Sequence, residues 1–315
     1  MKKNFLTFIG TFLLFITLSY SQDTSEYIVD DHVYSLFEQG QYDSVIKYIN
    51  KHYPMPKDEF DLPYFAHLEL KAKCFVLLDQ IDSAFNVLFN LTLPIHEDII
   101  YDKDFKKLQS DPRWEQWLNI FIEKNIINDN IEKKDLAKEL FLIEIEDQMI
   151  RTELLDLISS AESYNQEELS SIIDSFAKKM NTIDSINLLK IEKILKEYGW
   201  PSTELVGEQG VNTIFLIIQH ANAKARNNYS KLLKKAARKD ISQRPNYAYL
   251  IDKIKMDKGK KQIYGTQLKY VEEKKCFELF PIKNIKNVDK RREKMFLPNL
   301  DEYLKLIEEY YNLCK

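Results

Sequence analysis

The stretch DLAKELFLIEIEDQMIRTELLDLISSA, residues 135–161, decides the fold class of this chain. Its apolar residues recur at steps of three, four or seven, as they do along one face of an α-helix. The members of this stripe are Leu136, Leu140, Ile143, Ile150, Leu154, Leu157 and Ala161. We therefore expect one long amphipathic helix here and a mainly α-helical protein.

One position in this stripe is occupied by an acid, Asp147. A charged group at a core position costs free energy unless it is paired. Arg151 lies one helical turn later, where an ion pair can form, and Gln148 follows the acid directly. Two interpretations stay open: Asp147 and Arg151 form a bridge that fixes helix packing, or Asp147 points into a pocket. In the second case Gln148 and Arg151 are candidate ligand-binding residues.

The next helix is expected over about residues 183–198, and it stops at the sequence Tyr-Gly-Trp-Pro. Glycine permits a left-handed helix cap, and proline prevents the helix from continuing. Trp200 either packs back onto this helix as part of the stop signal or forms the wall of a pocket, and we include it among the ligand-binding candidates.

A buried helix is expected over residues 211–221, because it contains five consecutive apolar residues. It ends in two polar residues, Gln219 and His220. His220 continues an apolar face, so it is either a core histidine or a site residue. Gln219 favours a site, because two adjacent polar groups end a helix that should be buried. No second histidine lies nearby and no HExxH motif occurs, so we expect no metal site, although a mixed site of histidine and carboxylates stays open. We also expect no cofactor.

Two more helices and a β-hairpin are expected after this point. The helices cover residues 225–239 and the region from Pro245 to Gly259, where Asp252 stands among apolar residues. Alternation and turn chemistry predict the hairpin near residues 262–281. Ordering the polar side chains around Tyr-Gly-Thr costs conformational entropy, and specific hydrogen bonds are needed to offset that cost. The ligand-binding candidates in this part of the chain are Gln262, Tyr264, Gln267 and Arg291.

The first half of the chain has the spacing of paired helices with short turns. The ten residues LFEQGQYDSV at 36–45 resemble the first helix, turn and second helix of a tetratricopeptide-type repeat. The resemblance covers two units at most and lacks the tryptophan-led signature of that repeat. It implies that a protein or peptide partner can bind this half.

The chain begins with a predicted signal peptide, residues 1–21, in which two lysines precede an apolar run and small residues end it. We expect an exported protein, periplasmic or secreted, with no membrane span once this segment is removed. The remainder divides into a helical-repeat-like domain at 22–130 and a second domain at 131–315, α-helical with the small β-hairpin.

Composition excludes several classes of protein. The chain has 315 residues, is 44% hydrophobic and contains seven glycines and three cysteines. It is therefore neither wholly disordered nor collagen-like, nor a disulfide-dense miniprotein. Cys276 and Cys314 can form a disulfide, but we expect buried free thiols from their scattered positions.

Basic residues gather in the segment 224–294, whereas the preceding part is acidic. No nucleic-acid-binding motif accompanies them, so we expect no nucleic-acid partner. Either this segment is a solvated face or packs near the acidic remainder, which we favour, or it binds an acidic glycan or another anionic ligand.

Five sequence islands together resemble an uncharacterised bacterial family, the domain of unknown function 6624, over about residues 134–303. The islands are Asp147-Gln148-Met149-Ile150-Arg151, Gly199-Trp200-Pro201, Gln219-His220-Ala221, Ala248-Tyr249-Leu250 with Asp252, and Gln262 to Gln267. Two departures stand out: Asn222 and Lys253 occupy positions where members commonly carry Asp and Arg. An amide cannot act as a base, so a catalytic role for the residue at position 222 would be lost here.

Two functions follow from these residues. The first is a ligand- or partner-binding protein of the cell envelope, because no complete nucleophile–base motif occurs. The alternative is a hydrolase-like enzyme with His220 as general base, oriented by Asp147 or Asp252. The distances from His220 to a carboxylate and to a cavity distinguish the two. A third interpretation, a purely structural role, stays open if all these residues satisfy one another and no cavity is present.

Overall fold

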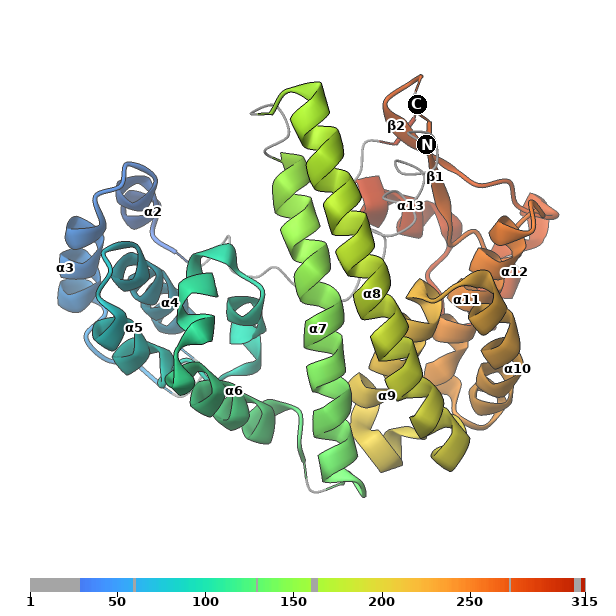
Figure 1. The fold of residues 1–315 in the computed structure, drawn as a ribbon, viewed down its shortest axis with the longest axis horizontal. Coiled ribbons are helices and arrows are strands. Elements are labelled where there is room, and N and C mark those ends of the chain that lie inside the picture. The colour runs from blue at the N-terminus through green and yellow to red at the C-terminus, as the bar shows by residue number, and fades with distance from the viewer. Residues whose placement is uncertain are drawn as a thin grey trace. The chain divides into compact units, whose positions relative to one another are not determined.

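The computed structural model describes residues 29–58, 61–128, 130–159, 164–271, 273–308 and 313–314. The predicted signal peptide, residues 1–21, lies outside this part of the chain. Helices dominate the described residues, and their only sheet is a two-stranded antiparallel hairpin (Figure 1). The expected mainly α-helical fold with a small β-hairpin is confirmed.

The chain forms two compact units. One lies within residues 22–130 and 151–161, and the other within residues 131–150 and 162–315. The end of the long helix is thus grouped with the first unit. The domain boundary expected at residue 130 stays a prediction.

The first unit begins with four helices that pack against one another in chain order. They are α2 (Asp31–Glu38), α3 (Tyr42–His52), α4 (Leu62–Leu77) and α5 (Ile81–Leu88). Val33, Val45 and Ile49 are fully buried between the first pair. This paired arrangement agrees with the helical region expected before residue 130.

The unit closes with two 3₁₀ segments and another helix. These are η2 (Pro94–Ile100), η3 (Lys103–Ser110) and α6 (Pro112–Asn125). Trp117 on α6 is fully buried, and its indole N–H donates to the carbonyl of Leu91 at 3.0 Å. The side chain of Asp111 caps the first turn of α6.

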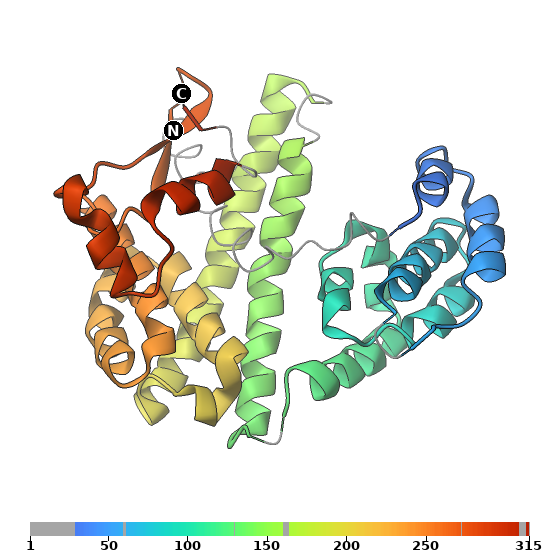
Figure 2. The same ribbon diagram turned by 180° about the vertical axis from the view of Figure 1, so that it is seen from behind.

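The second unit is built on a helix hairpin. Residues 134–150 of α7 (Lys134–Ser159) run antiparallel to the second half of α8 (Gln166–Tyr198), as Figures 1 and 2 show. Lys190 on α8 pairs with Glu146 on α7 at 2.6 Å.

Helix α8 begins at Gln166, so the start expected near residue 183 is wrong. Asn165 caps the helix, and Glu168 completes a capping box with it. Leu169, Ile172, Ile173, Phe176 and Met180 recur at helical spacing in this half of the helix, although of these only Met180 is buried. The apolar spacing and the capping box therefore both indicate the earlier start, which our prediction missed.

Helix α8 stops where the sequence predicts. Gly199 has φ 72°, which a residue with a side chain adopts only at a cost, and its N–H bonds to the carbonyl of Leu195. Helix α9 (Thr203–His220) follows, with a break at Gly207, where φ is 75°. A Cβ there would lie 2.9 Å from the side chain of Ile131, so glycine lets the two segments approach. The helix expected at 211–221 thus begins earlier.

The rest of the described second unit contains four further α-helices, two 3₁₀ segments and the hairpin. These elements are α10 (Ala223–Lys239), η5 (Ile241–Gln243), α11 (Arg244–Asp257), β1 (Leu268–Val271), β2 (Cys276–Leu279), η6 (Ile285–Asn287), α12 (Val288–Glu293) and α13 (Leu300–Glu308). In the hairpin Leu268 pairs with Leu279 and Val271 with Cys276. The predicted hairpin is therefore present, but residues 262–267 precede it as a loop.

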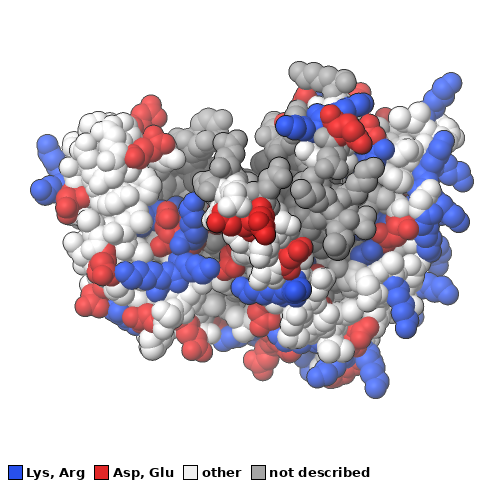
Figure 3. Space-filling view, turned by 45° about the horizontal axis from the view of Figure 1, so that its top comes forward, with Lys and Arg blue, Asp and Glu red and all other residues white. Residues whose placement is uncertain are grey.

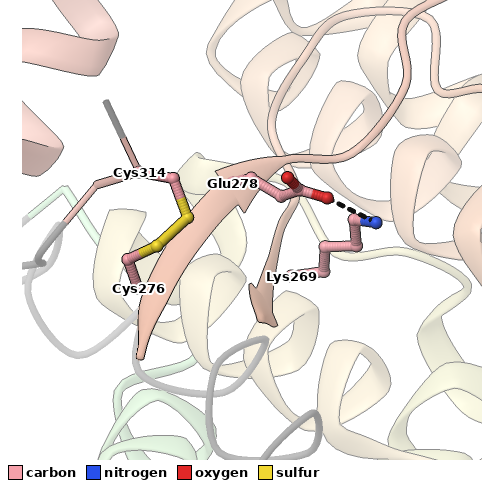
Figure 4. The surroundings of a disulfide bond; sticks show 4 residues. All are labelled: Lys269, Cys276, Glu278 and Cys314. Atoms are coloured by element: carbon pink, nitrogen blue, oxygen red, sulfur yellow. Dashed lines mark ion pairs between the residues drawn. A yellow bond between two sulfur atoms is a disulfide. The ribbon is translucent and has the colours of Figure 1, made fainter. Parts of the chain in front are cut away.

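A disulfide joins Cys276 to Cys314, with 5.1 Å between their Cα atoms (Figure 4). The expectation of free thiols is wrong for this pair and correct for Cys74, which is free and buried. Strand β2 places Cys276 beside the end of the chain, where the N–H of Cys314 bonds to the carbonyl of Phe277 at 2.8 Å. Sequence spacing alone does not show such a tertiary approach. Across the same hairpin, Lys269 pairs with Glu278 (Figure 4).

No helix among the described residues has both the length and the apolar character needed to cross a membrane.

Candidate functional site

Asp147 and His220 form a buried pair in the second unit. Nδ1 of His220 lies 3.0 Å from Oδ2 and 3.2 Å from Oδ1 of Asp147. Gln148 donates its amide N–H to Oδ2 of the same carboxylate at 2.6 Å. The Asp147 side chain is fully buried and the His220 side chain is 5% exposed. The acid that interrupts the apolar stripe of α7 therefore meets the histidine that ends α9.

The pair belongs to a polar seam between α7 and α9. One turn before Asp147, the Glu144 carboxylate accepts from Gln209 at 2.8 Å and from the Thr213 hydroxyl at 2.5 Å. Glu144 was not among the predicted site residues, although its position three residues before Asp147 puts it on the same helix face. The carboxylates of Glu144 and Asp147 on α7 thus fix the position of α9 along that helix.

A pocket of about 360 Å³ lies beside His220. Four helices line it: α8, α9, α10 and α11. Its polar side chains are Asn181, Asp184, Ser185, Gln219, His220, Asn222, Arg226, Lys253 and Asp257. We call it the His220 pocket.

Gln219 lines this pocket with an amide that the fold does not use. The residue is 3% exposed, and neither its side-chain nitrogen nor its oxygen has a hydrogen-bond partner among the described residues. A buried polar group without a partner costs about 1–3 kcal/mol. The unpaired Gln219 amide therefore lowers the free energy of unfolding relative to an apolar side chain of similar size at this position.

Arg226 connects the helices around the pocket. Its Nε and Nη2 donate to Oδ2 of Asp257 at 2.9 and 2.7 Å, and its Nη1 donates to the carbonyl of Gln219 at 3.2 Å. The same Nη1 also bonds to the carbonyl of Ala221. These contacts satisfy carbonyl groups at the end of α9, which no later turn of that helix can reach.

Lys253 is half-buried in the pocket lining. Burial, helped by the nearby charge of Arg226 and opposed by that of Asp257, lowers the pKa of its amine to about 8. Among the described residues it makes neither a hydrogen bond nor an ion pair. The Asp257 carboxylate beside it is already engaged by Arg226.

Asn222 has a structural role that accounts for the amide at this position, where members of the similar family commonly carry Asp. Its side chain accepts from the N–H of Ala225 at 3.0 Å and caps α10. Asp and Asn perform this role about equally well. The amide at position 222 is thus compatible with an intact pocket.

Asp252 lies fully buried in a separate cluster. Its carboxylate accepts from the N–H groups of Ile263 at 2.6 Å, Tyr264 at 3.0 Å and Thr266 at 3.1 Å. The Thr266 hydroxyl also donates to it at 3.1 Å. Burial raises the pKa of Asp252, and these hydrogen bonds act against that rise. Asp252 thus anchors the loop before the hairpin, and none of these bonds involves His220.

The two glutamines of this loop bond within the fold. The Gln262 amide donates to the carbonyls of Gln267 at 3.0 Å and Phe280 at 2.6 Å, and its oxygen accepts from the N–H of Gln267 at 2.9 Å. The Gln267 amide donates to the Thr266 hydroxyl at 3.1 Å. The cost of ordering them is therefore offset by hydrogen bonds inside the protein.

Two arginines close the loop from the other side. Arg291 donates to the carbonyl of Ile263 at 2.8 Å, and Arg292, which was not among the predicted site residues, donates to the carbonyl of Tyr264 at 2.7 Å. Tyr264 is buried, and burial raises its pKa to about 12. We call this group, Asp252 with residues 262–267 and the two arginines, the Asp252 cluster.

The candidate residues thus fall into two sets. Asp147, Gln148, Gln219 and His220 lie together at or behind the pocket. The Asp252 cluster holds Asp252, Gln262, Tyr264, Gln267 and Arg291. Trp200 is 9% exposed and does not line the pocket, and Arg151 is fully buried. Whether Arg151 pairs with Asp147 stays a prediction.

The basic segment is most concentrated on α10, which has no acidic residue. Its exposed cations are Lys224, Lys231, Lys234, Lys235, Arg238 and Lys239. None of them forms an ion pair among the described residues of the chain. Figure 3 shows basic side chains gathered at the edge of the view on which α10 and α12 lie in Figure 1. Within its own unit this face is solvated.

In the described part of the chain, no group of three or more His, Cys, Asp or Glu side chains is placed to hold a metal ion.

The fold and the site define a mainly helical protein with a polar pocket beside a buried Asp–His pair. The model of DUF6624, a family of unknown function, matches residues 134–315, slightly beyond the end expected from sequence. The chain belongs to this family. No curated protein and no solved structure matches it.

Proposed function

We propose that this chain binds a small polar ligand in the His220 pocket. The observation that carries the proposal is the Gln219 amide, which is buried, lines the pocket and has no partner among the described residues. A ligand that accepts from its N–H group and donates to its oxygen would remove the cost of burying both.

Gln262, a second buried glutamine of the same unit, provides a comparison for Gln219. The Gln262 side chain makes three hydrogen bonds to backbone groups, whereas the Gln219 side chain makes none. Leucine would fill a similar volume at position 219 without the polar cost. A buried residue that lowers the stability of the fold is typical of a binding site, where residues are kept for function at a cost in stability.

Replacing Gln219 by leucine is expected to raise the free energy of unfolding by about 1–2 kcal/mol, because no buried polar group is then left unpaired. The same variant should lose stabilisation by a ligand. Urea unfolding measures the first effect. A thermal-shift screen of amino acids, sugars, nucleotides and short peptides against wild type and variant measures the second.

Gln39→Leu is the matched control, since Gln39 is exposed in the first unit. This control should keep both stability and ligand response within error. A Gln219→Leu protein that is less stable than wild type and responds to the same compounds would contradict the proposal.

A second candidate function is acid–base catalysis of hydrolysis, which the distance from His220 to Asp147 supports. A carboxylate bonded to Nδ1 keeps the proton on that nitrogen and makes Nε2 the base. Two observations support this function: a carboxylate lies 3.0 Å from His220, and a cavity adjoins the histidine. Asp252, the other acid considered, bonds the loop at 263–266 instead.

If His220 is a general base, His220→Ala is expected to lower kcat by about 10²–10⁴-fold. Asp147→Asn should also lower it, because the amide favours the wrong tautomer. Nitrophenyl esters, amides and glycosides serve as the substrate panel. Glu144→Gln, in the same polar seam but away from His220, should keep most activity. Equal turnover by wild type and His220→Ala would exclude this function.

We also propose that the protein is exported. The signal-like segment at 1–21 supports this, and so does the Cys276–Cys314 disulfide, since such bonds persist in oxidising compartments. Mass spectrometry of periplasmic and extracellular fractions tests it by showing whether a chain starting at Gln22 is present.

We further propose that the first unit binds a peptide or protein, which the helical pairs α2–α5 support. A pull-down that compares the full chain with a variant lacking residues 22–130 tests this, because the variant should lose the partner.

A further inference from the structure

Lys253 differs from the other basic side chains of the His220 pocket. Arg226 pairs with Asp257 at 2.7 Å, and His220 pairs with Asp147 at 3.0 Å. Lys253 makes no ion pair or hydrogen bond among the described residues. It is nevertheless half-buried, so water solvates its ammonium group only in part.

The carboxylate whose charge acts on Lys253, Asp257, is bonded by another cation. Among the described residues, both side-chain hydrogen bonds to that carboxylate come from the guanidinium of Arg226. A partly buried charge is stable when an opposite charge lies within about 4–6 Å. Asp184 also lines the pocket, but in the described part of the chain no ion pair joins a carboxylate to Lys253, whereas a ligand could supply one.

We propose that the ligand of the His220 pocket carries an anionic group, a carboxylate or a phosphate, that pairs with Lys253 while the Gln219 amide bonds its polar part. This inference rests on the proposed function, because it names the chemistry of a ligand bound at the same site. Gln219 and Lys253 line one pocket of about 360 Å³, which suits a metabolite rather than a polymer.

Binding should depend on pH in a defined direction. Burial has lowered the pKa of Lys253 to about 8, so in the free protein the amine loses its proton above that value. An anion binds the protonated amine and raises its pKa, so binding above pH 8 requires uptake of a proton. Affinity should therefore be constant below about pH 8 and fall about tenfold per pH unit above it.

Other charged groups face the same space and must be separated from this effect. They are Arg226 on α10, Asp257 on α11, His220 on α9 and Asp184 on α8. Lys253→Arg separates them, because arginine stays protonated at these pH values. This variant should retain anion binding and lose the fall above pH 8.

The experiment is isothermal titration of the full chain with acetate, succinate and inorganic phosphate, and with neutral acetamide and glycerol, at pH 7 and pH 9. At least one anion should bind wild type. Lys253→Met should weaken that binding at least about tenfold, the effect of losing one ion pair worth about 1.4 kcal/mol. Lys255→Met, on the same helix but outside the pocket lining, is the matched control and should bind as wild type does.

The outcomes separate this inference from the proposed function. If acetamide or glycerol binds in a Gln219-dependent way and the anions bind no better, the pocket is a binding site but its ligand is not anionic. If an anion binds equally to wild type and Lys253→Met, contact with Lys253 is refuted. If none of these probes binds, both the anionic ligand and the binding function are overturned.

Discussion

Replacing Asp252 by alanine is expected to lower the free energy of unfolding by about 4 kcal/mol or more, an effect that only a few kinds of single substitution reach. The carboxylate holds three backbone N–H groups and one hydroxyl in a fully buried site. Without it, each donor loses a charged acceptor, and a buried unsatisfied donor costs about 1–3 kcal/mol. Urea unfolding followed by circular dichroism measures the loss.

Asp289→Ala is the matched control, because Asp289 accepts from a single backbone N–H, that of Leu300 at 2.8 Å. It should cost about 1 kcal/mol, the usual net value of one hydrogen bond. Asp252→Asn should fall between the two, since its oxygen can still accept but carries no charge. If Asp252→Ala and Asp289→Ala lose equal stability, Asp252 does not organise the loop.

Removing the disulfide by Cys276→Ser with Cys314→Ser is the second large effect that we expect. The bond closes a loop with a sequence separation of 38 residues. A loop of that size restricts the unfolded chain enough to stabilise the fold by about 4 kcal/mol. The double variant should therefore unfold at clearly lower urea concentration than oxidised wild type, and reduced wild type should match it.

Thiol titration provides the control for this prediction. Burial raises the pKa of Cys74 to about 12, so its thiol should be unreactive in the native protein. Unfolding without reductant should release one reactive thiol, and unfolding with reductant should release three. Three thiols in unreduced, unfolded protein would show that the bond does not form.

Local chemistry made much of the fold predictable. The stripe at 135–161 indicated the long helix, the Tyr-Gly-Trp-Pro sequence indicated where α8 ends, and alternation indicated the hairpin. Each of these signals lies within a few residues of the feature that it predicts. The start of α8 at Gln166 carried both a capping box and an apolar stripe from Leu169 to Met180, so it was predictable and our prediction missed it. The partner of Cys276 is decided by tertiary packing, which no local pattern shows.

The candidate site was predictable in part for a related reason. Burial of Asp147, Gln219, His220, Asp252 and Gln262 could be predicted, because each stands among apolar residues or in a costly loop. Sequence shows that such a group needs a partner but not which one. The structure assigns Asp252 and Gln262 to a self-satisfied cluster and joins His220 to Asp147. Gln219 is the member of this set whose side chain the described residues leave without a partner.

The guanidinium of Arg226 also restricts how the pocket can move. It holds the end of α9, through the carbonyl of Gln219, and Asp257 of α11 at the same time. The helices that carry Gln219 and Lys253 cannot separate without breaking those bonds. Movement that widens the cavity is therefore restricted on the side of α9 and α11, and a compound that enters must fit the spacing that Arg226 fixes between these two helices.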